Sequence, residues 1–533
     1  MPSTLAGRRC LGFRLPPDLM AAQQCSSVEF IEGFEWVIYS AASRYQHGPS
    51  IVAIITRVDL LKNRRTKIVA TIGPASGDLE SLTRLVKAGV NMFRLNMSHG
   101  SHADHALAYQ NIRAVEHQLK LPVAVLADLC GPKIRTGRFP PGGIELITGS
   151  EVVVTMRDVL GAPGLIPSQY QALSEDVEPG DRILIADGLL ELQVLNVAGT
   201  EVQCLVIHGG QLTDNKGINL PGVEVSAPSM TDKDEADAHF ALSLGVDYIA
   251  LSFVRQAADV DALRQLIGTD PLGPRIISKI EKPEALINAE DILAASDAIM
   301  IARGDLGVEL PPEEVPVAQA ELIQMARASG KPVIVATQML ESMIQHSRPT
   351  RAEVTDVSHA VNAGADAVML SGETAVGRFA VEAVEIMDRI ARQTEAHLWR
   401  QGAYGGSLSN LVPPLPLWNV IANATAHMSK ELMAHAVMVI SQSGLSAATV
   451  SSARPASPVV AITGDERILR RMTLYWGVIP LLEDEAGKTN PNELARRVAK
   501  SLGLAETGEF VLLIRGFNDA ADLNSPSITV ITV

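Results

Sequence analysis

Charged side chains stand at the ends of several short apolar runs in this sequence. The run Arg275–Ile280 contains Lys279 and is followed by Glu281, and Asp305 comes shortly after the run Ala298–Ala302. Carboxylates are hard oxygen ligands that suit Mg²⁺, which commonly takes one or two of them and completes its shell with water and substrate. Glu281 and Asp305 are therefore candidate ligands of a divalent metal.

Cationic side chains occur at the same kind of position. Arg94 lies within one apolar run, and Arg135 follows another. Together with Lys279 they would place three positive charges near the metal. Phosphoryl transfer depends on positioning and on neutralising charge, so this set suits a phosphorylated anionic substrate. No Ser-His-Asp or Cys-His arrangement competes for the site, and His99 alone is a weak base candidate.

These side chains need a scaffold that brings strand ends to one face. From Thr66 onward, short apolar runs alternate with amphipathic stretches such as Asp78–Ala88, which Gly89 would terminate. Eight such strands separated by helices predict a closed (β/α)₈ TIM barrel of the α/β class, with catalytic residues at the carboxyl ends of the strands. The predicted strands are Lys67–Ile72, Met92–Met97, Val123–Leu129, Tyr248–Phe253, Arg275–Ile280, Ala298–Ala302, Val333–Thr337 and Ala367–Leu370.

Two regions break the barrel pattern. From about Gly137 to Gly222, alternating strands and Gly- and Pro-rich turns predict an all-β lid inserted between the third and fourth barrel strands. After about Glu395, a Gly/Ser/Pro-rich linker leads to a second α/β pattern. The predicted organisation is an N-terminal extension of unknown role at 1–61, the barrel at 62–136 and 224–395, the β lid at 137–223, and a C-terminal α/β regulatory domain at 405–533.

Composition argues against several classes of function. The 533 residues carry a formal charge of −15, from 45 Lys and Arg against 60 Asp and Glu, which disfavours binding to nucleic acid or to an anionic membrane. No apolar run approaches the ~20 residues of a membrane helix, and no convincing signal peptide is present. We expect a cytoplasmic protein, without a zinc site or disulfides, because its four cysteines stand far apart, at Cys10, Cys25, Cys130 and Cys204.

The longer motifs resemble those of the pyruvate kinase family. Their order and spacing match that family, as do the β insertion and the C-terminal region, and the resemblance covers about Arg64 to the C-terminus. The matching stretches are Thr66–Ser76, Arg94–Gly100, Gly131–Gly137, Ile276–Glu281, Ile299–Pro311, Ala336–Met343, Arg348–Glu353 and Met369–Ala375. The resemblance implies an allosteric, homotetrameric enzyme of glycolysis. It would use Mg²⁺ or Mn²⁺ to transfer the phosphoryl group of phosphoenolpyruvate to ADP, giving ATP and pyruvate.

The resemblance also implies a role for each matching residue. Glu281 and Asp305 would hold the metal, and Lys279 would stabilise the phosphoryl group in transit. The backbone at Gly304 and Asp305, with Thr337, would hold the substrate carboxylate. The implied nucleotide-binding residues are Arg94, which would contact phosphoryl oxygens, and Asn96, His99, Arg135 and the lid residue Lys216. The implied proton-relay residues are Ser371 and Glu373.

The chain departs from the family pattern at the potassium site. Many pyruvate kinases need K⁺, and these generally carry Glu where this sequence has Lys133 and Thr where it has Leu129. A fixed ammonium at Lys133 would supply a positive charge where the relatives recruit a mobile one, so we expect K⁺ not to be required. The residues of the matching cation region are Asn96, Ser98, Asp128, Leu129 and Lys133.

A serine-rich loop in the C-terminal region coincides with the family's regulatory phosphate loop. Backbone amides and hydroxyls at such a strand-to-helix junction can bind an anion, so a phosphorylated small-molecule effector is expected here. Gln442 and Leu445 stand where some fructose-1,6-bisphosphate-activated relatives carry basic residues, which favours a monophosphorylated sugar or nucleotide. The candidate effector residues are Ser441, Ser443, Gly444 and Ser446.

Two other classes of function stay open. One is a Mg²⁺-dependent barrel lyase or aldolase that handles a pyruvate enolate without a nucleotide, although the β lid and Lys216 argue against it. The other is a catalytically silent scaffold or sensor that retains the fold. The joint presence of the cations, the carboxylates and Thr337 argues against that alternative.

Overall fold

The structure, a computed structural model, describes residues 64–405, 414–517 and 524–533. The predicted N-terminal extension at 1–61 lies outside the described residues, as do Cys10 and Cys25. Cys130 and Cys204 are free thiols. None of the helices in the described ranges is long and apolar enough to cross a membrane.

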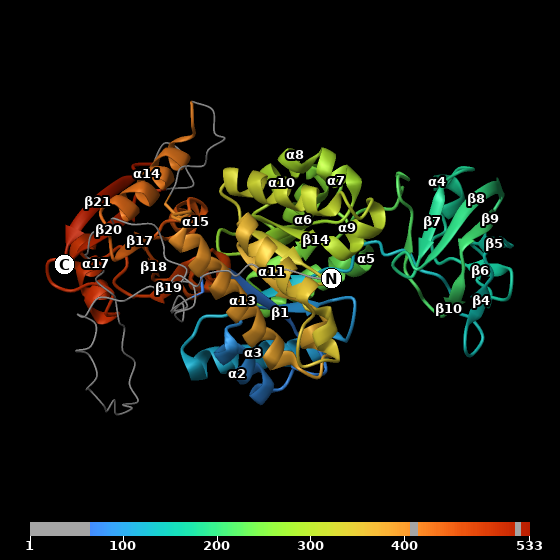
Figure 1. Ribbon diagram of the computed structural model, residues 1–533, viewed down its shortest axis with the longest axis horizontal. Coiled ribbons are helices and arrows are strands. Elements are labelled where there is room, and N and C mark those ends of the chain that lie inside the picture. The colour runs from blue at the N-terminus through green and yellow to red at the C-terminus, as the bar shows by residue number, and fades with distance from the viewer. Residues whose placement is uncertain (1–63, 406–413, 518–523) are drawn as a thin grey trace, which may run out of the picture. The chain divides into compact units, whose positions relative to one another are not determined.

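A closed parallel barrel forms the centre of the described fold (Figure 1). Its strands follow one another around the barrel in chain order, which confirms the predicted (β/α)₈ architecture. All of these strands are buried or nearly so, because helices cover the outside and side chains fill the inside. The strands are β1 (Lys67–Thr71), β2 (Met92–Asn96), β3 (Ala124–Asp128), β12 (Tyr248–Leu251), β13 (Arg275–Ile280), β14 (Ala298–Ala302), β15 (Val333–Ala336) and β16 (Ala367–Leu370).

Several barrel helices begin at a residue whose side chain caps the first turn. In α2, Asp78 caps the first turn by accepting from two backbone amides, and Gly89 ends the helix with a φ of 118°, which a side chain would disfavour. The helices of this region are α2 (Leu79–Ala88), α3 (His102–Leu119), α5 (Asp232–Leu244), α6 (Ala257–Ile267), α7 (Pro283–Ile287), α8 (Ala289–Ala295), α9 (Arg303–Glu309), α10 (Val315–Ala328), η2 (Glu341–Ile344), α11 (Arg351–Ala363), α12 (Gly372–Ala375) and α13 (Ala380–Arg400).

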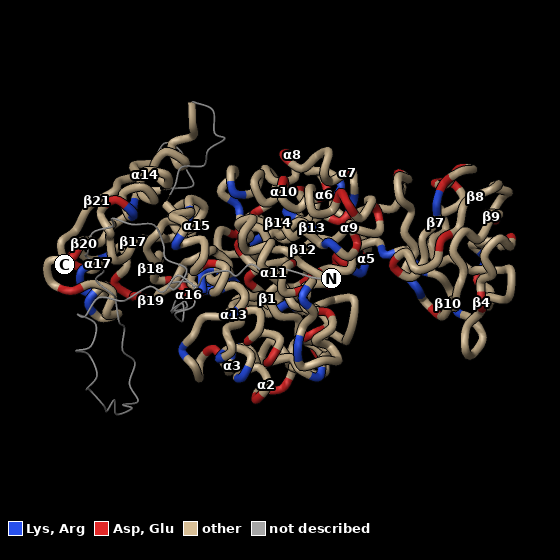
Figure 2. The backbone as a smooth tube through the Cα atoms, in the orientation of Figure 1, with Lys and Arg blue, Asp and Glu red and all other residues tan. Residues whose placement is uncertain are grey.

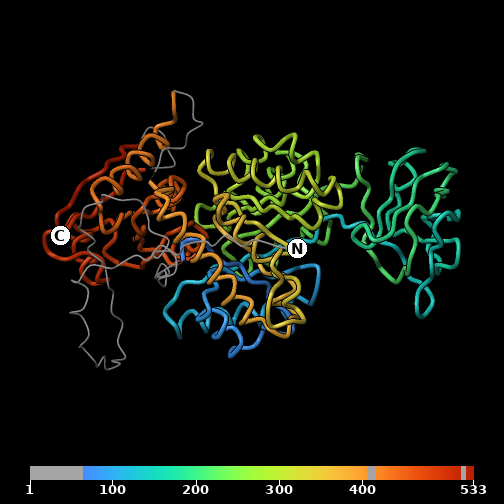
Figure 3. The backbone as a smooth tube through the Cα atoms, in the orientation of Figure 1, coloured from blue at the N-terminus to red at the C-terminus, as the bar shows by residue number. Residues whose placement is uncertain are grey.

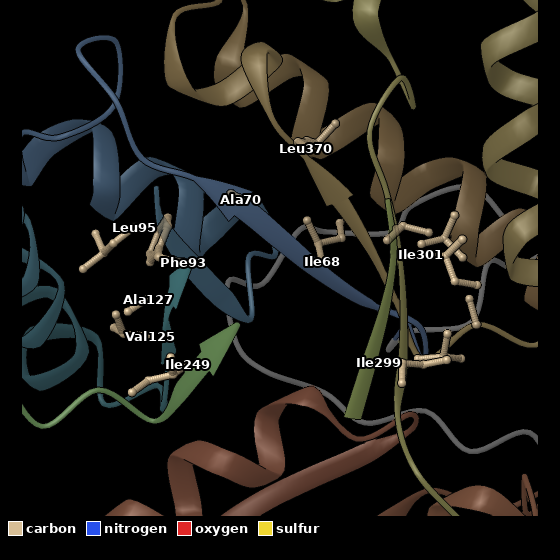
Figure 4. Packing of buried hydrophobic residues seen from close by; sticks show 14 of the residues in the cluster. Ile68, Ala70, Phe93, Leu95, Val125, Ala127, Ile249, Ile299, Ile301 and Leu370 are labelled. Carbon is tan, nitrogen blue, oxygen red and sulfur yellow. The ribbon is translucent and has the colours of Figure 1, made fainter. Parts of the chain in front are cut away.

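Two apolar clusters hold the barrel together. Outward-facing strand residues pack against the helices, and Figure 4 shows Phe93 and Leu95 of β2 beside Val125 and Ala127 of β3. A second cluster fills the barrel interior and includes Leu474 from the C-terminal region. Its buried members are Val69, Met92, Ala124, Leu126, Tyr248, Ala250, Ile277, Ala298, Met300, Ile334, Ala336, Ala367, Met369 and Leu474.

Between β3 and α5 the chain forms the predicted β-rich lid, drawn in cyan to green in Figure 3. The largest lid sheet has the order β11-β7-β8-β9-β5-β6, and β4 pairs with β10. One short helix, α4, interrupts the expected all-β pattern. The lid elements are β4 (Ile144–Leu146), β5 (Glu151–Thr155), β6 (Leu165–Pro167), α4 (Leu173–Asp176), β7 (Arg182–Ile185), β8 (Leu190–Ala198), β9 (Glu201–His208), β10 (Gly210–Leu212) and β11 (Ile218–Asn219).

The C-terminal region is an open α/β sheet, as expected from the sequence. Its order is β19-β18-β17-β20-β21, and only β21 runs antiparallel to its neighbour among the described strands of this sheet. The sequence pattern missed β19 and β21. The elements are α14 (Leu417–Glu431), β17 (Ala436–Ile440), α15 (Leu445–Ser452), β18 (Val459–Thr463), α16 (Glu466–Arg471), η3 (Met472–Leu474), β19 (Val478–Leu482), α17 (Pro491–Ser501), β20 (Phe510–Arg515) and β21 (Ser527–Thr532).

Charged residues of both signs are interspersed along the described chain (Figure 2). No single-sign stripe of Lys and Arg stands out in that view, in keeping with the formal charge of −15 for the whole sequence. A site for an anionic substrate must therefore gather its cations locally.

Candidate active site

The carboxyl ends of neighbouring barrel strands bring the candidate residues together. Asn96 of β2 stands in register with Asp128 of β3, and Lys279 of β13 stands in register with Met300 of β14. Because all eight strands are parallel, residues just beyond each strand meet on one face of the barrel. Residues far apart in the sequence thus come within hydrogen-bond reach.

Arg94, Asp128 and Lys279 form a connected network. Arg94 Nε donates to Asp128 Oδ2 over 2.5 Å, and Arg94 Nη1 donates to Thr71 Oγ1 over 3.1 Å. Lys279 Nζ lies 3.5 Å from Asp128 Oδ1 and 2.8 Å from Glu281 Oε1. Two of the three predicted cations therefore flank the same buried carboxylate.

Burial and charge together set the protonation of this network. Burial alone would raise the pKa of Asp128, but Lys279 and Arg94 outweigh it and hold that pKa below its usual value. Burial likewise would lower the pKa of Lys279, but Asp128 and Glu281 raise it above its usual value. Lys279 is thus held as an ammonium, which is the form that can neutralise charge on a substrate.

Glu281 and Asp305 offer a fit for a divalent metal. Glu281 Oε2 accepts the Phe253 backbone amide over 2.7 Å, whereas Oε1 is buried and faces the Lys279 ammonium at 2.8 Å. Burial raises the pKa of Glu281, Asp305 adds to this by repulsion, and Lys279 offsets part of it. An added cation would relieve this repulsion between the two carboxylates.

The protein supplies few ligands at this position. No group of three or more His, Cys, Asp or Glu side chains that could hold a metal occurs among the described residues. A site made by two carboxylates therefore suits Mg²⁺ or Mn²⁺, with water and substrate completing the shell, and would not suit a closed structural zinc site.

A hydrogen bond joins Gly304, at the start of α9, to Thr337, the residue just beyond β15. The Gly304 amide donates to Thr337 Oγ1 over 2.7 Å, and a Cβ at Gly304 would lie only 3.3 Å from that oxygen. Thr337 has a φ of 67°, an uncommon conformation for a β-branched residue. Arg303 also holds the start of α9 to the end of β15 by donating to the Thr337 carbonyl over 2.6 Å, and it donates to both oxygens of Asp356.

The proposed nucleotide residues lie along β2 and at the base of the lid. Asn96 Oδ1 accepts the Ser98 amide over 3.2 Å, and His99 is exposed. Arg135 Nη1 donates to the Asn215 carbonyl over 3.1 Å, which links the two chain segments that enter and leave the lid. Lys216 is exposed beside this link, so its ammonium is available to a ligand.

Ser371 and Glu373 occupy the end of β16. Glu373 is buried, and its carboxylate accepts the amides of Leu340 and Ser371 over 3.0 and 2.7 Å. The Ser371 hydroxyl is buried and has no hydrogen-bond partner. Glu373 therefore shapes the backbone here, while Ser371 offers a free hydroxyl.

The cation region contains no acidic residue at position 133. Lys133 is exposed, and its Cε would lie 3.6 Å from a Cβ placed on Gly217 of the lid. Leu129 is buried, and its carbonyl accepts the Ser252 hydroxyl over 2.7 Å. Lys133 thus adds a positive charge at the base of the lid.

The serine-rich loop before α15 is largely closed on itself. Ser441 and Ser446 are buried, and Gly444, with a φ of 90°, donates its amide to Ser441 Oγ over 3.1 Å. Ser443 is half-buried, and its hydroxyl accepts the Leu445 amide over 3.4 Å. Ser443 is the candidate effector residue with the greatest access to solvent.

Sequence reasoning missed Ser252, which lies just beyond β12. Its hydroxyl accepts from Lys279 Nζ over 2.7 Å and donates to the Leu129 carbonyl, so it orients the candidate catalytic ammonium. Its position in the sequence could have indicated it, because catalytic residues lie at the carboxyl ends of barrel strands. The fourth predicted strand, which corresponds to β12, was given no candidate residue at that end.

Comparisons with known proteins agree with this geometry. A family model described as "Pyruvate kinase, barrel domain" matches residues 63–384, and "Pyruvate kinase, alpha/beta domain" matches residues 419–528. A pyruvate kinase of Agrobacterium vitis is 42% identical over 88% of this chain and 97% of that relative. A pyruvate kinase of Geobacillus stearothermophilus is 43% identical over 85% of this chain and 78% of that relative.

Solved structures lead to the same assignment. The crystal structure of a pyruvate kinase from Cryptosporidium parvum superposes with a TM-score of 0.80 at 37% sequence identity, covering 88% of this chain and 97% of that one. The predicted resemblance is therefore confirmed in both sequence and fold, and the chain belongs to the pyruvate kinase family.

Proposed function

We propose that this protein transfers the phosphoryl group of phosphoenolpyruvate to ADP, producing ATP and pyruvate. The observation that carries the proposal is Lys279, whose ammonium lies between Asp128 and Glu281 and near Arg94. Phosphoryl transfer asks the protein mainly for positioning and charge neutralisation, and this cluster supplies both.

Each residue has a distinct part in the proposed reaction. Lys279 neutralises charge on the phosphoryl group as it moves, and Arg94 contacts phosphoryl oxygens on the nucleotide side. The backbone at Gly304 and Asp305, with Thr337, holds the substrate carboxylate. Glu281 and Asp305 would hold a divalent Mg²⁺ or Mn²⁺, which would supply positive charge to offset the negative charge of the substrates.

The lid completes the site on the nucleotide side. Asn96, His99, Arg135 and Lys216 would contact ADP, and closure of the lid would exclude water that could otherwise hydrolyse the phosphoryl group. Transfer to ADP leaves a pyruvate enolate, which must then be protonated. Ser371, with its unpaired hydroxyl, is the candidate in the proton relay.

Three finer features complete the proposal. Lys133 makes K⁺ unnecessary, because its ammonium supplies a fixed positive charge at the base of the lid. A monophosphorylated sugar or nucleotide acts as effector at the loop of Ser441, Ser443, Gly444 and Ser446. The enzyme works as a cytoplasmic homotetramer, in keeping with its membership in the pyruvate kinase family.

An assay of the full chain with phosphoenolpyruvate, ADP and Mg²⁺ tests the proposal. Pyruvate and ATP should form in equal amounts, and omission of ADP or of the divalent metal should abolish both. Pyruvate formation without ADP would instead favour a barrel lyase or aldolase. No turnover by a folded protein that still binds both substrates would favour a scaffold or sensor.

A further inference from the structure

Glu309, the last residue of α9, connects the barrel to the lid. Its Oε1 atom accepts from Lys282 Nζ over 2.7 Å and from Asn219 Nδ2 over 3.0 Å. Lys282 directly follows the candidate metal ligand Glu281, and Asn219 belongs to the lid strand β11. One carboxylate oxygen therefore joins three elements that are distant in the sequence.

The Glu309 carboxylate is positioned before any ligand binds. Its side chain is only 1% exposed, and that of Lys282 is 11% exposed. A buried carboxylate needs a nearby cation and hydrogen bonds, so Lys282 fixes Glu309 against the barrel. The second oxygen, Oε2, is buried without a hydrogen-bond partner. Among the described residues, Asn219 is thus the lid residue that donates to this carboxylate.

Asn219 is placed where it can control the nucleotide side of the site. It pairs in β11 with Leu184 of β7, and it follows Lys216 by three residues. The lid also comes close to α9 at a second point. A Cβ placed on Gly188, which follows β7, would lie 3.9 Å from the Val308 side chain of α9. The same short helix α9 begins with Arg303, Gly304 and Asp305. Holding β11 on α9 therefore sets the distance between the lid and the substrate side of the site.

We propose that Asn219 and Glu309 are positioning residues that hold the lid in the arrangement that binds ADP. The proposal rests on the proposed function, in which Lys216 meets the nucleotide. Without the contact, the binding-competent arrangement of the lid is less populated, and the apparent affinity for ADP falls by the same factor. In the proposed function, the residues that hold phosphoenolpyruvate all belong to the barrel, so its affinity should not change.

The first test is Asn219→Ala in the full-length enzyme. We expect a rise of about 10-fold in the KM for ADP, with the KM for phosphoenolpyruvate and kcat changed by less than about 3-fold. Asn196→Ala is the matched control, because Asn196 is an exposed asparagine on the lid strand β8. An unchanged KM for ADP would overturn the proposal. So would an equal rise in both KM values, since that would reflect a general structural role.

A charge-swap pair sharpens the test. Asn219→Asp places a second carboxylate against Glu309 and should raise the KM for ADP at least as much as Asn219→Ala. The double variant Asn219→Asp, Glu309→Gln exchanges the amide and the carboxylate between positions 219 and 309. The amide nitrogen at position 309 can then donate to the carboxylate at position 219, and the amide oxygen at position 309 can still accept from Lys282. The KM for ADP should return to within about 3-fold of the wild-type value. Independent, additive effects of the two substitutions would contradict a direct contact.

Amide hydrogen exchange separates failure of this inference from failure of the proposed function. In the ligand-free protein, Asn219→Ala should speed exchange in β7 and β11 and leave the barrel strands unchanged. If the wild-type protein lacks ADP-dependent turnover, the proposed function fails, and exchange alone decides whether the contact holds the lid. Unchanged exchange in both lid strands would overturn the inference.

Discussion

Lys279 Nζ lies 2.8 Å from Glu281 Oε1, within a single Lys-x-Glu sequence at the end of β13. This pair joins the group proposed to stabilise the moving phosphoryl to the group proposed to hold the metal. The two functions are therefore electrostatically coupled, and a substitution at either residue changes the environment of the other.

Replacing Lys279 by Met should lower kcat by about 10²- to 10³-fold, because a charge that stabilises the transition state is lost. Asp128 and Glu281 would also lose a buried counterion, so we expect the free energy of unfolding to fall by about 3 kcal/mol. Chemical denaturation and steady-state kinetics measure the two effects. Lys279→Arg keeps the charge and should retain most of the stability while losing activity. Turnover near the wild-type rate in folded Lys279→Met would exclude the assigned role.

Replacing Ser252 by Ala should misorient Lys279 without removing its charge. We expect kcat/KM for phosphoenolpyruvate to fall by about 10-fold, the effect of losing one hydrogen bond to a charged group. Ser243→Ala is a suitable control, because Ser243 is exposed near the end of α5. Equal kinetics in the two variants would mean that Ser252 does not orient the ammonium.

Lys67 should make stability depend on pH in the alkaline range. Its Nζ donates to the Val478 carbonyl over 2.7 Å, and burial, with a contribution from Arg64, lowers its pKa from 10.5 to about 7. Between these values the unfolded chain binds more protons than the folded one, so the free energy of unfolding should rise with pH. The slope should reach at most about 1.4 kcal/mol per pH unit.

Denaturation as a function of pH measures this contribution. The variant Lys67→Met should lose the slope, whereas Lys87→Met, at an exposed position in the last turn of α2, should keep it. A slope that persists in Lys67→Met would assign the pH dependence to another group.

Replacing Lys133 by Glu should create a potassium requirement. The wild-type enzyme should be active without K⁺, while the variant should lose about 10-fold in rate and regain it on addition of K⁺. Initial rates are compared over a KCl series, at constant ionic strength with a non-activating cation as the balance. A wild-type enzyme that is nearly inactive until K⁺ is supplied would contradict the assignment.

Replacing Ser443 by Asp should weaken activation by a phosphorylated effector. A carboxylate in the half-buried loop would repel an incoming phosphate, so the effector concentration for half activation should rise by at least about 10-fold. Glucose 6-phosphate and AMP are suitable probes, and basal activity without effector should be unchanged. If both wild type and variant are activated alike, the effector binds elsewhere.

Patterns in the amino-acid sequence were enough to predict the architecture and to name most residues of the candidate site. Barrel strands buried on both sides form near-continuous apolar runs, so strands such as Ala298–Ala302 could be placed to the residue. Because parallel strands all end on one face, Lys279, Glu281 and Asp305 could be grouped without knowing any distance. Strands β19 and β21 were missed, since β19 contains Pro480 and both lie at the edges of the sheet, where the apolar pattern is weaker.

Contacts between particular side chains could not be predicted before the chain's fold was known. Lys279 and Ser252 are 27 positions apart, and Asn219 and Glu309 are 90 positions apart. Their pairing depends on strand register, on the path of the lid and on burial, none of which leaves a local periodic pattern. The fold also decides the pKa directions, because the free energy of a charge depends on everything packed around it. Neighbouring charges outweigh burial at Asp128 and Lys279, whereas burial raises the pKa of Glu281.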